Sequence, residues 1–554
     1  MQAHNSAGNS SPAISRQAYL QLVIIILGVF MAILDTSVVT VAIPVMEHDL
    51  AATTNQIQWV LTGYMLAIGI LVPISGWMTE KVGPKRLFLI SLAIFTVGSA
   101  LSGAAWSLGS LIVFRILQAI GGGFMMPVSM AMIFRLFPPE KRGFVMGLLG
   151  IAMMAAPAFG PALSGYFVEY ASWRLIFYVN VPIGLLAVPL GMMWMKELPH
   201  HVSGKLDVWG FSFSTVGFFS LLYGFNEVPS SGWHSAEVVG LLTLGSVSLL
   251  LLVITELNVE NPVIQLRVLK NYMFSMSLVI TSIINVALFA GLFLLPLYLQ
   301  DIRGYTALRT GLFMTPAALL SALMMPISGR LMDRIGARPL GIVGLLIVAY
   351  GTFGFAHLTL YSRSADIQWL YILRSVGMGM TMMPIMTAGM NTVSQVWVSQ
   401  GTAMTNTVRQ VASSLGTALL TSYMTTQSNL YQATLNWQVT PLSATADWLQ
   451  KTALSLQGQY GMSAAAAKQE ATTLLMGLLG KEGFVAGLND TFYVSFILAA
   501  IAWVLVLFYA SAKERAARRG NQALREAGGN RKIPVAASER EVQSLPIPPR
   551  LRTE

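Results

Sequence analysis

A ten-residue signature occurs twice in the chain, each time between two long apolar segments. The first copy, GWMTEKVGPK, runs from Gly76 to Lys85, and the second, GRLMDRIGAR, runs from Gly329 to Arg338. Both copies keep two glycines, a carboxylate and a closing cation at the same offsets. A repeat of this density between apolar segments predicts a helical bundle that is duplicated within a membrane protein.

The composition agrees with a membrane protein. Of the 554 residues, 55% are hydrophobic and only 10% are charged, whereas soluble domains average about 25% charged residues. Apolar runs of about 20 residues, the length that an α-helix needs to cross a bilayer, predict an all-α integral membrane protein. We count fourteen such runs, at residues 20–46, 57–77, 87–106, 108–134, 144–168, 174–195, 208–226, 237–256, 273–299, 311–332, 339–358, 369–393, 402–425 and 490–511.

The 34 lysines and arginines indicate the orientation. If both termini are cytoplasmic, 24 of these residues lie on the cytoplasmic side, seven on the outer side and three within spans. Cytoplasmic loops are enriched in lysine and arginine. The asymmetry therefore favours a multi-pass protein of the cell (plasma or inner) membrane with both termini in the cytoplasm.

The two signature copies follow spans 2 and 10, so they lie on the same side of the membrane and the repeat is parallel. Six helices per unit leave two helices between the units, which predicts a 6+2+6 arrangement of fourteen helices. Arg115 in span 4 and Arg374 in span 12 are again eight spans apart, which extends the duplication beyond one loop. The expected parts are a cytoplasmic tail (1–19), a six-helix bundle (20–195), a two-helix insertion (196–272), a second six-helix bundle (273–511) and a basic cytoplasmic tail (512–554).

Four further segments carry small and polar residues at characteristic spacings. They are Leu34–Pro44, Arg115–Gly123, Pro157–Gly165 and Trp173–Gly184. Together with the doubled signature, they resemble motifs of the major facilitator superfamily and, within it, of the fourteen-helix drug:proton antiporters. The resemblance covers about the first 425 residues and the last span, and it implies the major facilitator fold. The chain departs from the family pattern at Pro84 and Ala337, where arginine is usual, and at Ala156 and Ser164, where glycine is usual.

Asp35 is the only carboxylate well inside a predicted span. Because a charge at that depth costs several kcal/mol, an acid there is a candidate functional residue. Such a carboxylate can take up and release a proton as its access to water changes, so Asp35 is the expected proton-coupling residue. The alternative is a structural aspartate that is satisfied by its neighbours Thr36 and Ser37.

Arg115 is expected to act together with Asp35. Because an arginine keeps its proton, Arg115 would hold positive charge near the pathway and bias the ionisation of Asp35, with Gln118 on the same helix face. The resemblance implies the same role. The alternative is an arginine that only ties its helix to backbone carbonyls across the bundle.

A further set of residues is expected to serve gating and conformational change. In the signature, glycines permit a short turn and carboxylates can accept from helix N-termini or pair with cations; the alternative is charge that only sets topology. In span 5, small residues and prolines predict a tight bent helix, or only a packing kink. Two intramembrane arginines lack an obvious acid and are assigned to structural or gating hydrogen bonds. The set comprises Gly76, Glu80, Gly83, Gly329, Asp333, Gly336, Pro157, Gly160, Pro161, Gly165, Arg374 and Arg409.

The substrate pathway can be assigned only by residue type. Methionines and aromatic residues suit adaptable apolar sites, although most such residues on membrane helices face lipid or neighbouring helices. The candidates are Met31, Trp59, Tyr64, Phe293, Tyr298, Gln300 and Asn406.

Two segments fall outside the predicted spans. Residues 427–489 are expected to form a long extracellular loop with a helical part at Ser463–Leu479, which either caps the outer mouth, binds a partner or is a passive surface. The tail after Ser511 is basic and rich in small residues. It is expected to be disordered and attracted to lipid, and it does not indicate a nucleic-acid module.

The sequence does not indicate an enzyme. It contains no G-x-x-x-x-G-K-[ST] loop, no cysteine and no histidine spacing typical of a metal site, so we expect no metal and no cofactor. The predicted function is proton-coupled export of amphiphilic or cationic drugs by alternating access, with small molecules, protons and membrane lipids as partners. Three alternatives stay open: dedicated export of one metabolite, antibiotic or lipid-like compound; a non-transporting sensor or scaffold; and assembly with an adaptor protein.

Overall fold

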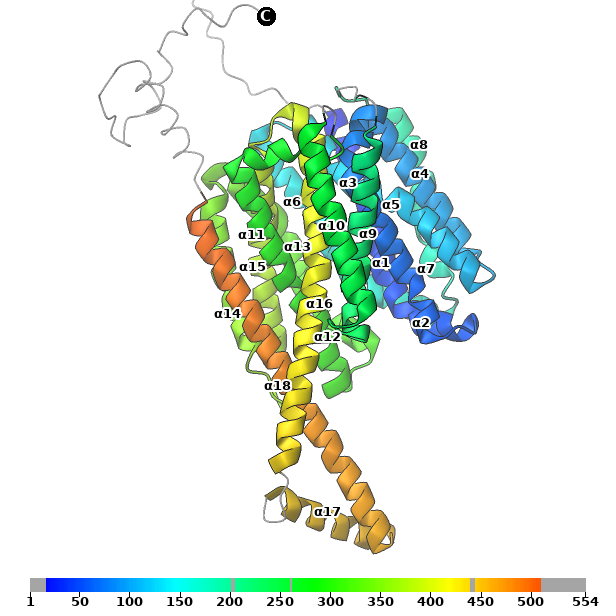
Figure 1. The fold of residues 1–554 in the computed structure, drawn as a ribbon, viewed down its shortest axis with the longest axis vertical. Helices are drawn as coiled ribbons and strands as arrows, with labels where there is room; N and C mark the ends of the chain where they lie inside the picture. Colours follow the sequence, from blue (N-terminus) through cyan, green and yellow to red (C-terminus); the bar gives the residue numbers. More distant parts are fainter. Residues whose placement is uncertain (1–15, 201–203, 205, 260–261, 439–443, 510–554) are drawn as a thin grey trace, which may run out of the picture.

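The computed structural model describes residues 16–509 apart from 201–203, 205, 260–261 and 439–443 (Figure 1). Residues 1–15 and the expected basic tail lie outside the described residues. The described part is helical and contains no strand. Its longer helices are α1 (Arg16–Asp49), α3 (Trp59–Val82), α4 (Pro84–Gly103), α5 (Leu108–Leu136), α6 (Pro139–Tyr170), α8 (Asn180–Trp194), α9 (Val208–Ser231), α10 (Ala236–Asn258), α11 (Tyr272–Phe289), α13 (Ala307–Ile335), α14 (Ala337–Phe355), α15 (Ser364–Met390), α16 (Val398–Gln438), α17 (Ala444–Tyr460) and α18 (Ala464–Leu507).

Twelve helical stretches of the described chain are long and apolar enough to cross a membrane. Each of them overlaps one of the fourteen predicted spans. The other two predicted spans, 369–393 and 402–425, coincide with α15 and α16, which are not among the twelve. Helix α16 is rich in Ser, Thr, Asn and Gln and also contains Arg409. These polar residues lower the hydropathy of α16, so it is not among the twelve although its residues 402–425 count among the fourteen apolar runs.

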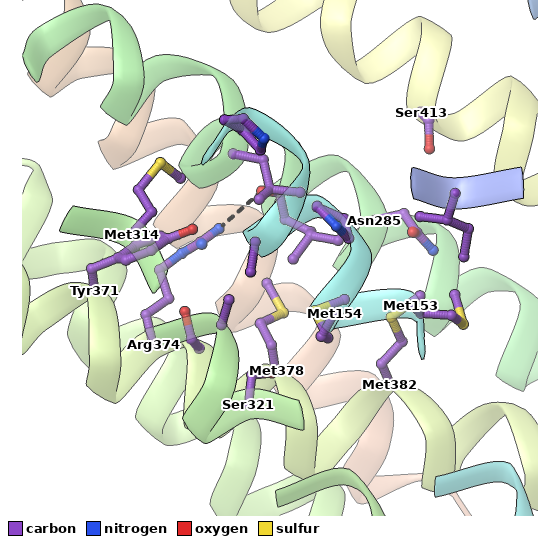
Figure 2. A pocket seen from close by; sticks show the side chains of 18 of the residues that line it. Met153, Met154, Asn285, Met314, Ser321, Tyr371, Arg374, Met378, Met382 and Ser413 are labelled. Carbon is purple, nitrogen blue, oxygen red and sulfur yellow. Dashed lines mark hydrogen bonds between the residues drawn. The ribbon is translucent and has the colours of Figure 1, made fainter. Parts of the chain in front are cut away.

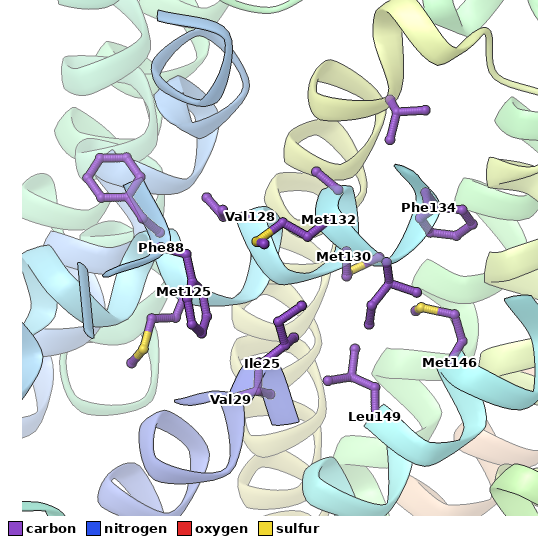
Figure 3. Close-up of a cluster of buried hydrophobic side chains, with 14 of the residues drawn as sticks. Ile25, Val29, Phe88, Met125, Val128, Met130, Met132, Phe134, Met146 and Leu149 are labelled. Carbon is purple, nitrogen blue, oxygen red and sulfur yellow. The ribbon is translucent and has the colours of Figure 1, made fainter. Parts of the chain in front are cut away.

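The first helix group consists of α1, α3, α4, α5, α6 and α8, which pack against one another. Short helices α2 (Thr54–Ile57) and α7 (Leu175–Tyr178) connect its members. The core of the group is built from large apolar side chains of facing helices. Figure 3 shows Val29 of α1, Phe88 of α4, Met125 of α5 and Leu149 of α6 in this buried cluster.

The second helix group consists of α11, α13, α14, α15, α16 and α18. After α11 the chain continues through two π-helical turns, η2 (Ala290–Leu294) and η3 (Tyr298–Ile302), which flank the single-turn helix α12 (Leu295–Leu297). Predicted span 9 is therefore not one regular α-helix. The two groups meet mainly where α6 lies along α13 and where α3 lies along α16.

Helices α9 and α10 lie between the two groups in the sequence and pack against each other. Glycines allow the two helices to approach closely: a Cβ atom on Gly217 would lie 2.6 Å from Leu249, and one on Gly245 would lie 2.8 Å from Leu221. Helix α9 also contacts α3 and α16. The pair therefore covers one seam between the helix groups (Figure 1).

The segment predicted as a long loop, 427–489, is largely helical. Helix α16 continues to Gln438, α17 follows, and α18 begins at Ala464, so these helices project beyond the bundle (Figure 1). Glycines permit the contact between α16 and α18, since a Cβ atom on Gly487 would lie 2.6 Å from the backbone nitrogen of Ser428. The expectation of a loop missed this extension because the segment is polar, and polarity does not prevent a helix that packs on a neighbour.

Candidate functional site

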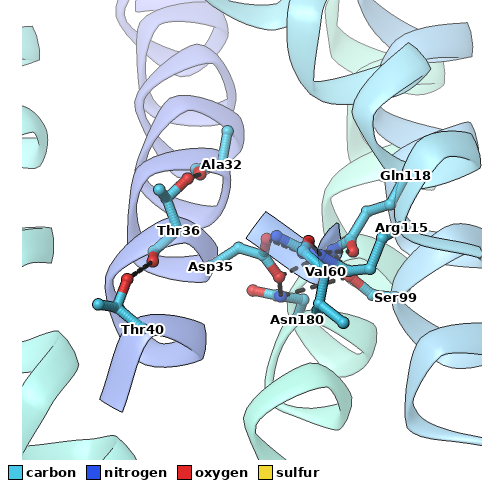
Figure 4. A network of polar contacts seen from close by, with 9 residues as sticks. All are labelled: Ala32, Asp35, Thr36, Thr40, Val60, Ser99, Arg115, Gln118 and Asn180. Carbon is cyan, nitrogen blue, oxygen red and sulfur yellow. Dashed lines mark hydrogen bonds and ion pairs between the residues drawn. The ribbon is translucent and has the colours of Figure 1, made fainter. Parts of the chain in front are cut away.

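Asp35 lies at the centre of a buried polar network in the first helix group (Figure 4). Its Oδ2 accepts from Nη1 of Arg115 at 2.5 Å. Its Oδ1 accepts from Nε2 of Gln118 at 2.8 Å and from Nδ2 of Asn180 at 3.1 Å. Neither the aspartate nor the arginine side chain is exposed. Helices α1, α5 and α8 thus converge on one carboxylate, and α4 adds Ser99, whose hydroxyl accepts from Gln118 and Asn180.

Arg115 has a second set of contacts besides the carboxylate. Its Nε donates to the backbone carbonyl of Val60 at 3.3 Å, and its guanidinium carbon lies 3.9 Å from the centre of the Tyr64 ring. Arg115 therefore pairs with the acid and also ties α5 to α3. Tyr64, a candidate for the substrate pathway, instead stacks on this arginine, which is a favourable cation–π arrangement.

The neighbours of Asp35 do not satisfy its carboxylate. Thr36 donates to the carbonyl of Ala32 at 3.3 Å, and Ser37 donates to the carbonyl of Pro157 at 3.5 Å. The hydrogen-bond partners of Asp35 come from other helices. Removing its negative charge would leave Arg115 buried without a counter-ion, which is a costly arrangement.

The opposite face of α1 is in close contact with α6. A Cβ atom on Gly160 would lie 2.6 Å from Cβ of Ser37, so only glycine allows this approach without a shift. Ser164, where the family usually has glycine, donates to the carbonyl of Val38 at 2.7 Å. Helix α1 therefore joins the Asp35 network on one face to α6 on the other. A Cβ atom on Gly165 would meet no other atom within 4 Å, so this glycine does not take part in the contact.

Each signature contains a turn that requires glycine. Gly83, between α3 and α4, has φ 93° and ψ 140°, and Gly336, between α13 and α14, has φ 87° and ψ 170°. L-residues rarely adopt this region. The residues that depart from the family pattern, Pro84 and Ala337, are the first residues of α4 and α14. A proline at this position has no amide to lose and a suitable φ, so the turn is preserved.

The carboxylates of the two signatures bind different partners. Glu80 pairs with Arg135 at the end of α5, and both side chains are nearly buried. Arg135 also donates to Ser399 of α16 at 3.0 Å. Asp333 accepts from the backbone nitrogens of Gly143 and Phe144, near the start of α6, at 2.9 and 3.0 Å. Asp333 therefore accepts from the start of a helix, whereas Glu80 pairs with a cation.

The first glycines of the signatures lie at helix crossings between the two groups. A Cβ atom on Gly329 would lie 2.0 Å from the carbonyl oxygen of Gly143, and one on Gly76 would lie 3.1 Å from Cα of Gln400. Arg142 adds a hydrogen bond of 2.9 Å to Asn391 at the end of α15. The two groups are therefore held together at the end of the bundle that carries the signatures, which we call the signature end.

A cavity of about 290 Å³ lies between α1 and α6 of the first group and α11, α13, α15 and α16 of the second. Its lining is mainly apolar, and Figure 2 shows its methionines. On α6, α13 and α15, the residues that line the cavity lie farther from the signature end than the residues that form the contacts there. Pro157 and Pro161 of α6 line the cavity, so these residues of the predicted gating set adjoin it. The lining methionines are Met153, Met154, Met314, Met378 and Met382.

Arg374 and Arg409, the two other intramembrane arginines, also line this cavity. Arg374 is 1% exposed, and it donates to the carbonyl of Ala287 and, at 3.2 Å, to the hydroxyl of Thr352. Arg409 donates to Asn406 at 2.8 Å. Arg115 pairs with a carboxylate of α1, whereas its repeat counterpart Arg374 donates to backbone carbonyls of α11. Arg374 also lies close to Gly291, because a Cβ atom on this glycine would lie 2.1 Å from Nη1 of Arg374.

None of the residues expected to form the substrate pathway is among those that line the cavity. Met31 is packed in the core, and Tyr298 is buried and donates to the carbonyl of Thr359. Trp59 and Phe293 are partly exposed, at 40% and 37%, and Gln300 is exposed as well. Asn406 accepts a hydrogen bond from Arg409, which lines the cavity. The helix face, rather than the residue type, decides which methionines and aromatics reach the cavity.

Several residues of these networks were not identified from the sequence. Arg135, Ser399 and Asn391 connect the helix groups, and Ser99 supports the Asp35 network. Asn180 gave a signal, because it belongs to the family-like segment Trp173–Gly184. Among the described residues, no group of three or more His, Cys, Asp or Glu side chains is placed to hold a metal ion.

Comparisons with known proteins identify the family. The family model for the Major Facilitator Superfamily matches residues 25–417. The chain is 41% identical over 384 residues to the uncharacterized MFS-type transporter YhcA of Bacillus subtilis, covering 69% of this chain and 72% of YhcA. It is 28% identical over 513 residues to the multidrug export protein EmrB of Haemophilus influenzae, covering 91% of this chain and 98% of EmrB.

A solved structure shows the same fold. The proton:xylose symporter XylE superposes with a TM-score of 0.56 at 12% sequence identity, covering 90% of this chain and 97% of XylE. This level of identity supports the fold alone. The doubled signature, the helical architecture and the family match agree with one another, and the chain therefore belongs to the major facilitator superfamily and is a multi-pass membrane transporter.

Proposed function

We propose that the protein exports amphiphilic small molecules in exchange for protons. The observation that carries the proposal is the buried pair of Asp35 and Arg115 on helices α1 and α5. Ionisable residues at membrane depth are rare, pair with one another and mark functional sites such as proton relays. The proposed direction and substrate breadth follow the name of EmrB, a multidrug export protein that aligns with nearly the whole chain.

The proposed architecture has fourteen transmembrane helices arranged 6+2+6. It comprises the twelve apolar stretches together with α15 and α16, with α9 and α10 as the insertion. In this arrangement, the signature end faces the cytoplasm of the cell, and both termini lie on that side. The concentration of lysines and arginines in the loops of this end supports the orientation.

The proposed transport cycle is alternating access, in which the two helix groups rock about the central cavity. The contacts of Asp333, Arg142 and Arg135 at the signature end close the cavity on the cytoplasmic side. These contacts have to break when the cavity opens to the cytoplasm. The doubled signature then acts as a pair of latches, one on each helix group.

Helix α1 provides a physical link between proton binding and the cavity. Protonation of Asp35 from outside would weaken its ion pair with Arg115 and loosen α1 from α5. Because Ser37 and Gly160 hold α1 tightly against α6, a shift of α1 is passed to the helix that lines the cavity. Each proton that enters along the membrane potential supplies about 2.3 kcal/mol per 100 mV.

The test is a panel of fluorescent drugs in cells that lack their own efflux pumps. We expect export by the wild type to stop when a protonophore is added. Asp35→Asn should abolish gradient-driven export when export is normalised to the amount of protein in the membrane. Asp366→Asn is the matched control, because this acid is exposed at the start of α15. Normal export by a well-expressed Asp35→Asn variant would refute the assignment of Asp35.

A second measurement uses purified protein in liposomes that contain a pH-sensitive dye. Addition of a transported drug should cause proton movement in the wild type and not in Asp35→Asn. If no drug of the panel is exported and none moves protons, the reading of the chain as a non-transporting sensor or scaffold is favoured instead.

A further inference from the structure

The central cavity has a pronounced charge imbalance. Its lining contains the guanidinium groups of Arg374 and Arg409, and no aspartate or glutamate is among the described residues that line it. Neither arginine forms an ion pair with a carboxylate of the described chain. The cavity is therefore positively charged, because arginine stays protonated in proteins.

Neutral groups satisfy only part of the hydrogen-bonding capacity of the two arginines. Arg374 donates to a threonine hydroxyl and to backbone carbonyls, and Arg409 donates to the amide oxygen of Asn406. These acceptors reduce the cost of burying the donors but do not supply a negative charge. A charge held in a low-dielectric site without a counter-ion is unfavourable, and an anion that enters the site removes this cost.

The acid of the first helix group does not compensate these charges. Asp35 binds Arg115, Gln118 and Asn180, and its side chain is fully buried on the face of α1 that packs on α5 and α8. A cation in the cavity would therefore meet two positive groups and no described carboxylate. The sequence-based expectation of cationic substrates finds no support in the lining.

The rest of the lining determines which anions fit. Met153, Met154 and Met314, with Leu288 and Leu292, present a flexible apolar surface, and methionine adapts to ligands of different shape. A volume of about 290 Å³ lies at the lower end of the range for drug-sized ligands. A suitable ligand has a compact apolar body and one acidic group.

We propose that the cavity binds amphiphilic anions, with Arg409 as the direct partner of a carboxylate or sulfonate and Arg374 as a second positive charge. Arg409 is the better direct contact because it is only half-buried, whereas Arg374 is almost completely enclosed. This inference rests on the proposed export function, since it assigns the substrate class of the same cavity.

The test compares two probes that share one apolar body, pyrenebutyrate and pyrenebutyl-trimethylammonium, in binding to the purified full-length protein. We expect the wild type to prefer the anion. Arg409→Gln should weaken binding of the anion at least about tenfold, because a charge-assisted hydrogen bond is lost, and it should leave binding of the cation unchanged or stronger. Arg409→Lys keeps the charge and should bind the anion with intermediate affinity.

A second variant adds a charge without removing an arginine. Ser413 lines the cavity one helical turn after Arg409, so Ser413→Glu would provide a counter-ion at i,i+4. We expect this variant to lose the preference for the anion, whereas the uncharged control Ser413→Gln keeps it. Monodisperse elution of each variant shows that the fold is retained.

The outcomes separate this inference from the export function. Preference of the wild type for the cation, equal weakening of both probes by Arg409→Gln, or no binding of either probe would overturn the anion site. Export of cationic drugs together with any of these results would leave the export function standing. Selective binding of the anion without transport would instead retain the anion site and reject the export function.

Discussion

Asp35 and Arg115 form an ion pair of 2.5 Å in which neither side chain is exposed, and the two residues are 80 positions apart in the sequence. Three further polar side chains complete the network, so the pair joins four helices of the first group. The ion pair is therefore a structural contact between α1 and α5. It also contains the carboxylate of this network, which is the group that the proposed proton coupling uses.

The structural part of this pair can be measured separately from transport. We expect Asp35→Asn to lower the free energy of unfolding by about 3–5 kcal/mol, because it leaves a buried arginine without its counter-ion. The double variant Asp35→Asn/Arg115→Gln should recover much of this loss, since no unpaired charge remains, yet it should not regain proton-driven export. Thermal unfolding of purified protein gives the first result, and drug efflux gives the second. Equal destabilisation of the single and double variants would show that the ion pair is not the main contact.

The latch at the signature end can be tested by cysteine labelling, because the chain contains no cysteine. A single cysteine in place of Ser413 reports access to the cavity from outside with a membrane-impermeant maleimide. We expect Asp333→Ala to reduce the labelling rate about tenfold, because loss of hydrogen bonds to a carboxylate favours the state that is open at the signature end. Asp447→Ala is the control, since Asp447 forms an exposed pair with Lys451 in α17. Unchanged labelling in Asp333→Ala would remove Asp333 from the latch.

The crossing of α6 and α13 should not tolerate a methyl group. Gly329→Ala places a Cβ atom 2.0 Å from the carbonyl oxygen of Gly143, and such overpacking typically costs about 1–3 kcal/mol. We expect a lower unfolding temperature and reduced transport. Gly165→Ala provides the matched control within α6, because no atom lies within 4 Å of its Cβ position. Similar behaviour of the two variants would mean that the helices separate easily at this crossing.

Gly336 provides a test of backbone strain alone. Its φ of 87° and ψ of 170° lie in a region that is nearly restricted to glycine, and a Cβ atom there would meet no neighbour within 4 Å. Gly336→Ala and Gly336→Asn should therefore cost a similar amount, about 1–3 kcal/mol. Asparagine should give no advantage, because it favours a different left-handed region with smaller ψ. Thermal unfolding of both variants measures the cost, and a clearly milder effect of asparagine would contradict this explanation.

The fold could be predicted from the sequence to a large extent. Apolar length and the spacing of the repeated signature do not depend on the details of packing, so they identified the helical membrane class and the family. Helices α15 and α16 show the limit of this approach. Several of their polar residues are buried against neighbouring helices, among them Arg374, Thr402 and Asn406. Their composition alone therefore indicates a membrane span less clearly.

The candidate site was predicted in part. Asp35 and Arg115 could be singled out because a charge at bilayer depth is rare, and the structure places them together. Ser99 and Asn180 could not be singled out by type, since small polar residues are common on membrane helices. None of the residues expected in the substrate pathway lines the described cavity. Met31 and Met153 are chemically identical, and only the orientation of their helices places one in the core and the other at the cavity.

The sequence by itself determined that this chain is a duplicated membrane bundle, that one carboxylate lies deep within it, and that glycines are required at two turns. These properties follow from local chemistry: apolar length, the cost of a buried charge and the conformational range of glycine. Only the tertiary structure decided which partners each charge has. It paired Asp35 with Arg115 and left Arg374 and Arg409 facing a cavity without a described acid, because those relationships depend on how separate helices are rotated against one another.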